Sequence, residues 1–64
     1  MNAAEWNRDF PAGTLVLLTL ANGQHVTTRT ASQAETWGGM SHVQVEAIPV
    51  GYVPLDWCQP LQQP

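Results

Sequence analysis

The strongest structural signal in this 64-residue chain is a pair of β-strand patterns separated by an Asn-Gly turn. Residues 14–20 are rich in aliphatic and β-branched side chains, and a second run of this kind covers residues 24–30. Asn22-Gly23 lies between them and is typical of a tight hairpin turn, because glycine readily adopts a positive φ. The sequence therefore predicts a β-hairpin as the first structured unit.

The length of the turn decides which side chains of this hairpin share a face. A two-residue turn pairs Leu18 with Thr27. A three-residue turn with Gly23 as the bulge residue pairs Leu18 with Val26. We favour the three-residue turn because it separates apolar from polar side chains better. The side chains that then share one face are Val16, Leu18, Leu20, Val26 and Thr28.

The favoured register leaves two leucines, Leu15 and Leu17, on the opposite face beside Arg29. A chain of this size buries only about 60% of its unfolded surface, and its single cysteine cannot form an intramolecular disulfide. Association with further copies would reinforce such a fold. We therefore predict a homo-oligomer whose interface contains Leu15, Leu17 and two N-terminal aromatic residues, Trp6 and Phe10.

An N-terminal arm, residues 1–12, is predicted to precede a single β-rich domain at residues 13–61. Trp6 and Phe10 lie among polar residues in the arm. Their rings either contact another subunit or partner, or they cover the open end of their own fold, as small barrels commonly require. Residues 62–64 are interpreted as a C-terminal tail.

A helix-start signal lies between the second and third predicted strands. Ser32-Gln33-Ala34-Glu35 matches the Ser-x-x-Glu capping box, in which the two side chains satisfy free backbone N–H groups. Gly38-Gly39 can end such an element, because glycine adopts the left-handed conformation found after helices. We predict a helix of one or two turns here, with Trp37 plugging one end of a barrel.

Residues 41–47 alternate between apolar and polar side chains, which predicts a half-buried strand. The inward side chains are Val43, Val45 and Ala47, and the outward ones are His42, Gln44 and Glu46. Residues 48–51 are expected to form a tight connection. Tyr52-Val53 then forms a short strand that Pro54 interrupts, because proline removes a backbone donor. Residues 55–57 are predicted to form a 3₁₀ turn.

The segment Gly51-Tyr52-Val53-Pro54-Leu55-Asp56-Trp57 resembles the C-terminal part of an SH3 domain. There, a Gly-aromatic/aliphatic-Val/Ile-Pro-x-Asn/Asp-aromatic pattern leads from the last long strand through a 3₁₀ turn. The resemblance implies an all-β fold over roughly residues 14–61. The expected architecture is a small five-stranded SH3-like barrel, with one short helix or turn between strands 2 and 3 and a 3₁₀ turn near the C-terminus.

The resemblance also implies candidate binding residues. In peptide-binding SH3 domains the proline and the following aromatic residue line the ligand groove, and the matching positions here are Pro54 and Trp57. The third strand departs from that pattern, because it reads Val43-Gln44-Val45 in place of a tryptophan pair. Val43-Gln44-Val45-Glu46 is similar to the Val-Gln-Ile-Tyr strand of type II dihydrofolate reductases, which implies that several copies can build one site around a symmetry axis.

Charge narrows the classes of partner. The net charge is −3, and the positive side chains are Arg8 and Arg29. The chain thus lacks the basic surface that supplies most non-specific nucleic-acid affinity, so duplex nucleic acid is not an expected partner. The first residues do not resemble a signal peptide, and no apolar run approaches the roughly 20 residues of a membrane span. We expect a cytoplasmic protein.

No catalytic or metal-binding arrangement is predicted, and no cofactor. A catalytic thiol needs an imidazole close by to act as its base, but nothing in the sequence places Cys58 next to His25 or His42. A His42, Glu46 and Asp56 metal site is disfavoured, because His42 and Glu46 on one strand lie about 13 Å apart. We interpret Cys58 as a buried thiol and expect that the protein is not an enzyme.

The expected function is that of a non-catalytic protein-interaction module that acts as a homo-oligomer and engages a protein through Trp57, Tyr52 and Pro54. The composition and residues 28–34 resemble small accessory proteins of bacteriophages and mobile elements, so a phage-encoded inhibitor of a host protein is one form of this hypothesis. The alternative is a small-molecule or nucleotide-binding protein, with Arg29 and Thr27 forming a site at a subunit junction.

Overall fold

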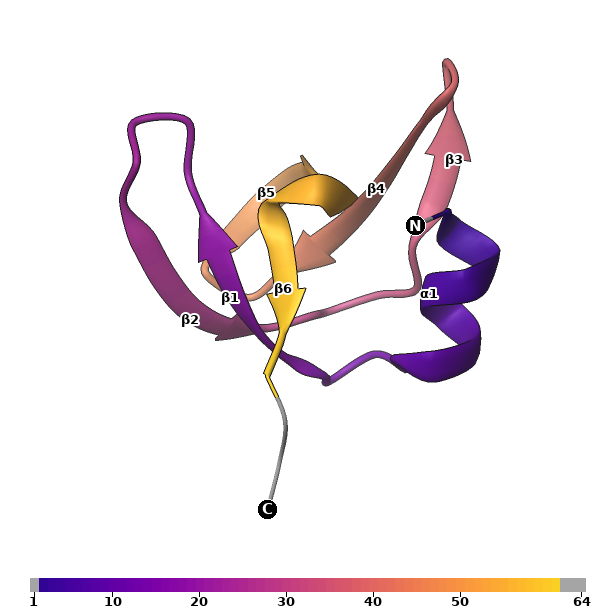
Figure 1. The fold of residues 1–64 in the computed structure, drawn as a ribbon, viewed down its shortest axis with the longest axis horizontal. Helices are drawn as coiled ribbons and strands as arrows, with labels where there is room; N and C mark the ends of the chain where they lie inside the picture. Colours follow the sequence, from indigo (N-terminus) through magenta and orange to yellow (C-terminus); the bar gives the residue numbers. More distant parts are fainter. Residues whose placement is uncertain (1, 62–64) are drawn as a thin grey trace.

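A computed structural model describes residues 2–61 and shows a mostly β fold with one short N-terminal helix (Figure 1). The predicted tail, residues 62–64, lies outside the described residues. The elements, in chain order, are α1 (Ala3–Asp9), β1 (Leu15–Thr19), β2 (His25–Arg29), β3 (Glu35–Trp37), β4 (Met40–Val45), β5 (Ile48–Pro54), the 3₁₀ helix η1 (Leu55–Trp57) and β6 (Cys58–Pro60).

The strands form two three-stranded antiparallel sheets, with strand orders β2-β1-β6 and β3-β4-β5. The prediction of a β-rich fold is confirmed, and so is the 3₁₀ turn at residues 55–57. The expected closed five-stranded barrel is not formed, because within residues 2–61 the strands divide between two open sheets.

The β1–β2 hairpin has the favoured register. Leu18 lies opposite Val26, and the backbone N–H of Leu20 donates to the carbonyl of Gln24 at 2.8 Å. Gly23 has φ +88°, the conformation that a three-residue turn of this kind requires. The inward side chains of β1 are fully buried, and Leu15 and Leu17 lie on the opposite face, half-buried.

The β4–β5 hairpin is tighter than predicted. Val43 and Val45 are buried as expected, but Ala47 is exposed because it lies in a two-residue turn with Glu46. Val45 pairs with Ile48, so residues 48–51 belong to β5 and do not form a separate connection. β5 tolerates its prolines because it is the edge strand of its sheet, where one side of the backbone needs no partner.

The prediction of a short helix that begins at Ser32 and ends at Gly38-Gly39 is wrong. The Ser32 hydroxyl instead accepts from the backbone N–H of Gln44 at 3.3 Å, which ties this segment to β4. Glu35 begins strand β3, and Gly38-Gly39, with φ of +58° and +77°, forms the turn of the β3–β4 hairpin. Trp37 accordingly plugs no end of the fold and is 46% exposed.

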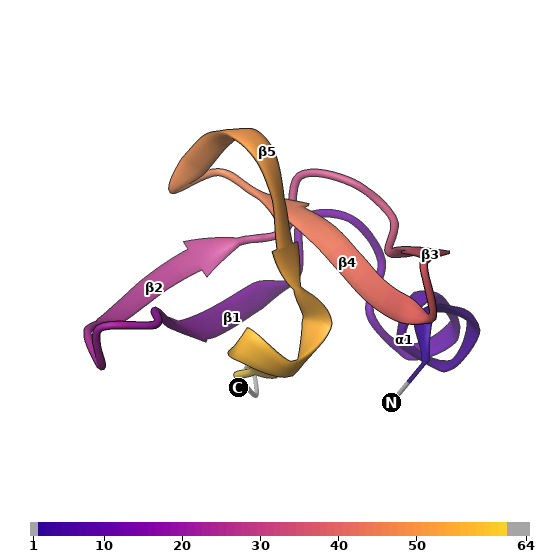
Figure 2. The same ribbon diagram turned by 90° about the horizontal axis from the view of Figure 1, so that it is seen from above.

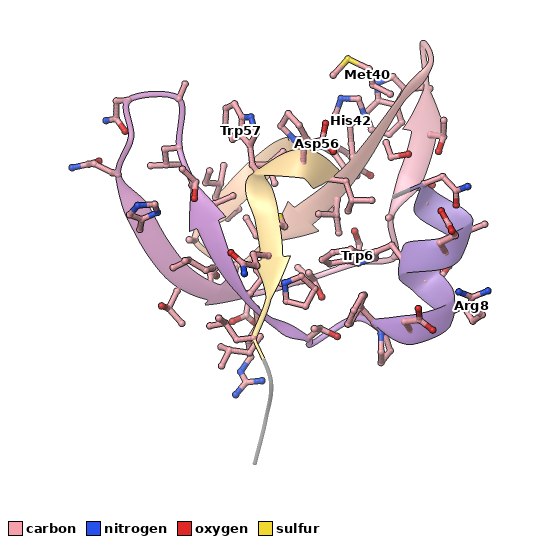
Figure 3. All side chains as sticks on the ribbon, in the orientation of Figure 1. Trp6, Arg8, Met40, His42, Asp56 and Trp57 are labelled. Atoms are coloured by element: carbon pink, nitrogen blue, oxygen red, sulfur yellow. The ribbon has the colours of Figure 1, made fainter. Side chains whose placement is uncertain are left out.

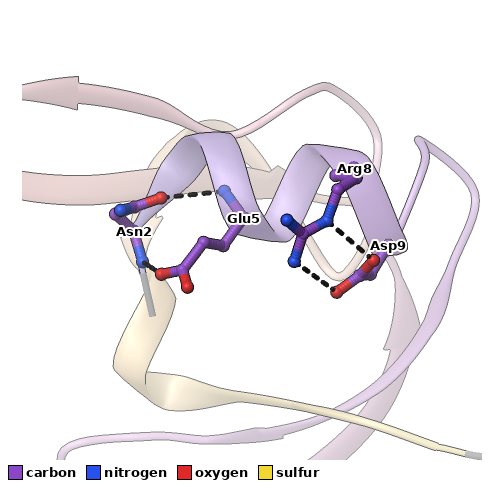
Figure 4. A network of polar contacts seen from close by, with 4 residues as sticks. All are labelled: Asn2, Glu5, Arg8 and Asp9. Carbon is purple, nitrogen blue, oxygen red and sulfur yellow. Dashed lines mark hydrogen bonds and ion pairs between the residues drawn. The ribbon is translucent and has the colours of Figure 1, made fainter.

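The N-terminal arm contains the helix, and its capping box joins Asn2 and Glu5 (Figure 4). The Asn2 side chain accepts from the backbone N–H of Glu5 at 2.8 Å, and the Glu5 carboxylate accepts from the backbone N–H of Asn2 at 3.2 Å. Asn7 then anchors the helix: its amide exchanges two hydrogen bonds, of 2.9 and 2.8 Å, with the backbone of Ala34.

The two sheets meet at Thr30, which bridges to Val45. The buried Thr30 hydroxyl also accepts from the backbone N–H groups of Gly13 and Thr14, at 3.1 and 3.2 Å. In Figures 1 and 2, α1 lies beside β3, at the end opposite the β1–β2 turn. The core between these ends consists of Ala3, Trp6, Val16, Leu18, Ala34, Val43, Val45, Val53, Leu55 and Cys58.

Candidate functional site

The outer face of the β3-β4-β5 sheet carries exposed aromatic side chains. Register places Trp37 opposite Met40, and His42 opposite both Glu35 and Pro54. Directly opposed residues in antiparallel strands share a face, and alternate residues of one strand share it too. We call this surface the aromatic face; its residues are Glu35, Trp37, Met40, His42, Tyr52 and Pro54.

Its three rings contact one another around Trp37. The indole of Trp37 stacks on the imidazole of His42, with centroids 4.4 Å apart and planes 7° apart. The ring of Tyr52 meets Trp37 edge-on, at 4.9 Å and 88°. Trp37, Met40 and Tyr52 are nevertheless 46%, 53% and 40% exposed. The face therefore presents large apolar groups in a fixed arrangement.

A polar contact fixes the edge of the ring cluster. The hydroxyl of Tyr52 donates to Oε2 of Glu35 at 3.2 Å. This hydrogen bond to a carboxylate raises the pKa of Tyr52, because losing the proton would leave two negative groups in contact; the negative charge of Glu35 and partial desolvation act in the same direction. The Tyr52 ring is thus held by its hydroxyl and by Trp37.

A small pocket of about 180 Å³ adjoins the aromatic face, and we call it the Asp56 pocket. Met40 and Pro54 belong to both surfaces, and Figure 3 shows Met40, His42 and Asp56 along the same edge of the molecule. Its volume is below the roughly 300–1,000 Å³ of ligand and cofactor sites, so it suits one side chain better than a cofactor. Its lining residues are Gly39, Met40, Ser41, Pro54, Leu55 and Asp56.

The structure brings together two of the three predicted partner-binding residues. Tyr52 and Pro54 lie on the aromatic face. Trp57 is half-buried in η1 and packs against the core. Sequence reasoning missed Trp37 and Met40, because it assigned Trp37 to a helix. The signal that was available is the Trp-Gly-Gly-Met pattern itself, in which Gly-Gly can form a hairpin turn that sets its two flanking side chains opposite each other.

The predicted oligomer-interface residues lie in two different places. Leu15 and Leu17 are half-buried on the outer face of the β2-β1-β6 sheet, where Leu17 lies between Thr27 and Gln59. Trp6 is only 2% exposed and points from α1 into the interior (Figure 3), while Phe10 packs against it with ring centroids 4.8 Å apart. These two rings cover their own fold, so we leave them out of any proposed interface.

The predicted ligand-binding pair, Arg29 and Thr27, is exposed on that same outer face. Nη1 of Arg29 donates to the backbone carbonyl of Gly13 at 3.1 Å. This bond joins β2 to the segment that precedes β1. The side chain of Arg29 thus already contributes a contact within its own chain.

The side chains considered for a thiol and imidazole pair lie on different strands: Cys58 on β6, His25 on β2 and His42 on β4. Burial raises the pKa of the Cys58 thiol to about 11, so at neutral pH it is protonated and a poor nucleophile. His25 is hydrogen-bonded to the Thr19 hydroxyl at 3.0 Å on the sheet surface. Across residues 2–61, no group of three or more His, Cys, Asp or Glu side chains is placed to hold a metal ion.

No protein-family model, curated protein or solved structure matches this chain. The part of the chain that the structure describes contains no helix long and apolar enough to cross a membrane.

Proposed function

We propose that this protein is a non-catalytic interaction module that binds a protein partner through the aromatic face. The observation that carries this proposal is the fixed cluster of exposed rings around Trp37. Tryptophan and tyrosine dominate the binding energy of protein interfaces, and rings that are already held lose little conformational freedom on binding.

The exposure of these side chains also needs an explanation. Placing Trp37, Met40 and Tyr52 together in water forgoes the stabilisation that burial of apolar area supplies, about 25 cal/mol per Å². Contiguous exposed apolar surface of this kind marks interaction sites on folded domains. A protein partner that covers the aromatic face would recover this energy.

A homo-oligomer remains part of the proposal, and it would use the other sheet. Leu15 and Leu17 lie on the outer face of β1, away from the aromatic face, so self-association there would leave the aromatic face free. We also propose that the fold is a variant of the SH3-like barrel opened into two sheets. The 3₁₀ turn between the last two strands supports this relationship. A phage-encoded inhibitor of a host protein is one form that the function can take.

The alternative of a small-molecule or nucleotide site at Arg29 and Thr27 has weaker support. The Arg29 guanidinium already donates to Gly13, and both side chains stand on an exposed strand surface. The pocket described above lies on the other sheet and contains a carboxylate, which would repel the phosphates of a nucleotide.

Affinity capture with matched variants tests the proposal. Immobilised wild-type protein, Trp37→Ala and Thr27→Ala are exposed to a lysate of the cells that produce the protein, and retained proteins are quantified by mass spectrometry. Loss of a central anchor at an interface commonly costs about 2 kcal/mol or more. We expect Trp37→Ala to reduce recovery of the specific partner about 30-fold, with Thr27→Ala unchanged. Equal recovery by a folded Trp37→Ala protein would contradict the proposal.

A further inference from the structure

We propose that the partner's segment is basic, and that one of its Lys or Arg side chains enters the Asp56 pocket while adjacent residues lie over the aromatic face. This inference rests on the proposed function and adds the chemistry of the partner.

The charges around the aromatic face all have one sign. Glu35 belongs to the face and Asp56 lines the adjoining pocket. The chain contains two cationic side chains, Arg8 and Arg29, and both are placed elsewhere. Arg8 lies on α1, and Arg29 lies on β2 at the outer face of the other sheet. The formally charged side chains of the aromatic face and of the Asp56 pocket are therefore both carboxylates.

The two carboxylates also lack a cationic partner within residues 2–61, because the ion pair in this part of the chain joins Arg8 to Asp9 at 3.2 Å (Figure 4). Glu35 accepts one hydrogen bond, from Tyr52, and a carboxylate can accept several. A guanidinium or ammonium group from a partner would supply the missing positive charge and charge-assisted hydrogen bonds.

The Asp56 pocket combines polar and apolar lining, and the polar surface is the larger share. Met40 and Pro54 line it together with Asp56. Lys and Arg pack their methylene stems on apolar surface while the charged head reaches a polar partner. The pocket volume of about 180 Å³ accommodates one side chain of this kind. Charge, shape and position next to the rings thus agree on a basic segment.

A peptide selection tests this inference. Fluorescent wild-type protein is applied to an array of random dodecapeptides at low salt, and the amino acids enriched among the brightest spots are counted. The strongest peptide is then titrated by fluorescence anisotropy against the wild type, Asp56→Asn and Asp9→Asn. Asp9→Asn removes the same charge from the last residue of α1, which belongs neither to the aromatic face nor to the pocket lining.

We expect Arg or Lys to be enriched in the selected peptides, and replacing that residue by Gln should abolish most of the affinity. Asp56→Asn should weaken the peptide affinity about tenfold, and Asp9→Asn should change this affinity less than twofold. Added salt should also weaken the affinity, because it screens exposed charge pairs. Selection of peptides without Arg or Lys, equal binding by Asp56→Asn, or no binder at all would overturn the inference.

One further titration separates this inference from the proposed function. If selected neutral peptides lose binding with Trp37→Ala but not with Asp56→Asn, the aromatic face binds proteins and the partner is not basic. If binding depends on neither residue, the proposed function fails as well.

Discussion

The indole of Trp37 lies parallel to the imidazole of His42, with ring centroids 4.4 Å apart, although the two residues stand on different strands. The Gly38-Gly39 turn produces this contact, because it brings β4 back along β3. An exposed tryptophan is therefore held in place by its own sheet. This arrangement distinguishes the aromatic face from a scatter of surface apolar residues.

The buried and exposed tryptophans should differ in their effect on stability. Trp6 is 2% exposed, so Trp6→Ala should lower the free energy of unfolding by about 3–5 kcal/mol, a large part of the total for a small domain. The indole N–H of Trp6 has no hydrogen-bond partner among residues 2–61, so Trp6→Phe should cost less. Urea unfolding followed by circular dichroism measures both, with Trp37→Ala as the exposed control. Equal losses for Trp6→Ala and Trp37→Ala would contradict the core described here.

The two hydrogen bonds between the Asn7 side chain and the backbone of Ala34 should anchor the N-terminal helix. Asn7→Ala leaves the backbone N–H and carbonyl of Ala34 without these partners, which should lower the free energy of unfolding by about 1–3 kcal/mol. Arg8→Ala, on the same helix, removes an exposed ion pair and should leave the free energy of unfolding nearly unchanged. The difference is measured by chemical denaturation. A harmless Asn7→Ala would show that α1 is held by other contacts.

The pKa of Tyr52 should report on its contact with Glu35. Tyr52 is the single tyrosine of the chain, so the ultraviolet absorbance of tyrosinate follows it alone during a pH titration. The carboxylate of Glu35 raises the Tyr52 pKa above the ordinary value of 10.0, and Glu35→Gln should bring it back toward that value. Glu46→Gln, in the β4–β5 turn, is the matched control. An unchanged titration in Glu35→Gln would exclude the contact.

The buried thiol of Cys58 should make stability depend on alkaline pH. Its pKa is about 11 in the folded protein, against 9.0 when unperturbed, so the folded state favours the protonated thiol. The contribution of the protonated Cys58 thiol to the free energy of unfolding is fully present below pH 9 and is lost as the pH rises toward 11. Cys58→Ala should flatten that part of the stability curve measured by urea unfolding. Iodoacetamide should label Cys58 slowly in the native protein and rapidly in urea; rapid native labelling would contradict its burial.

Signals confined to one hairpin predicted the fold well. The β1–β2 register followed from segregating apolar side chains around Gly23, and the burial of Val43 and Val45 followed from alternation. Capping signals were less reliable. Ser32–Glu35 has the letters of a capping box, but the Ser32 hydroxyl binds Gln44 and the next residues pair with β4. Tertiary contacts decide between such local options, and the sequence pattern does not contain them.

The candidate site shows the same division. Tyr52 and Pro54 were predicted as partner-binding residues from the short segment 51–57 that resembles part of an SH3 domain, and both lie on β5. Trp37 was missed because its exposure depends on which element it occupies. Trp57, predicted as a partner-binding residue, is half-buried in η1 and packs against the core. The Asp56 pocket was beyond reach of sequence reasoning, since its lining comes from residues 39–41 at the start of β4 and from residues 54–56 at the end of β5 and in η1, which meet only in the folded chain.

Nuclear magnetic resonance of the side-chain N–H groups tests the central claim most directly. The three tryptophan indoles and the Nε–H of Arg29 give separate signals in the ¹⁵N-labelled protein, and they are followed as the captured partner is added. We predict that the Trp37 signal shifts or broadens while those of Trp6 and Arg29 stay in place. A response of Arg29 with an unmoved Trp37 signal would place the binding surface on the other sheet and contradict the account.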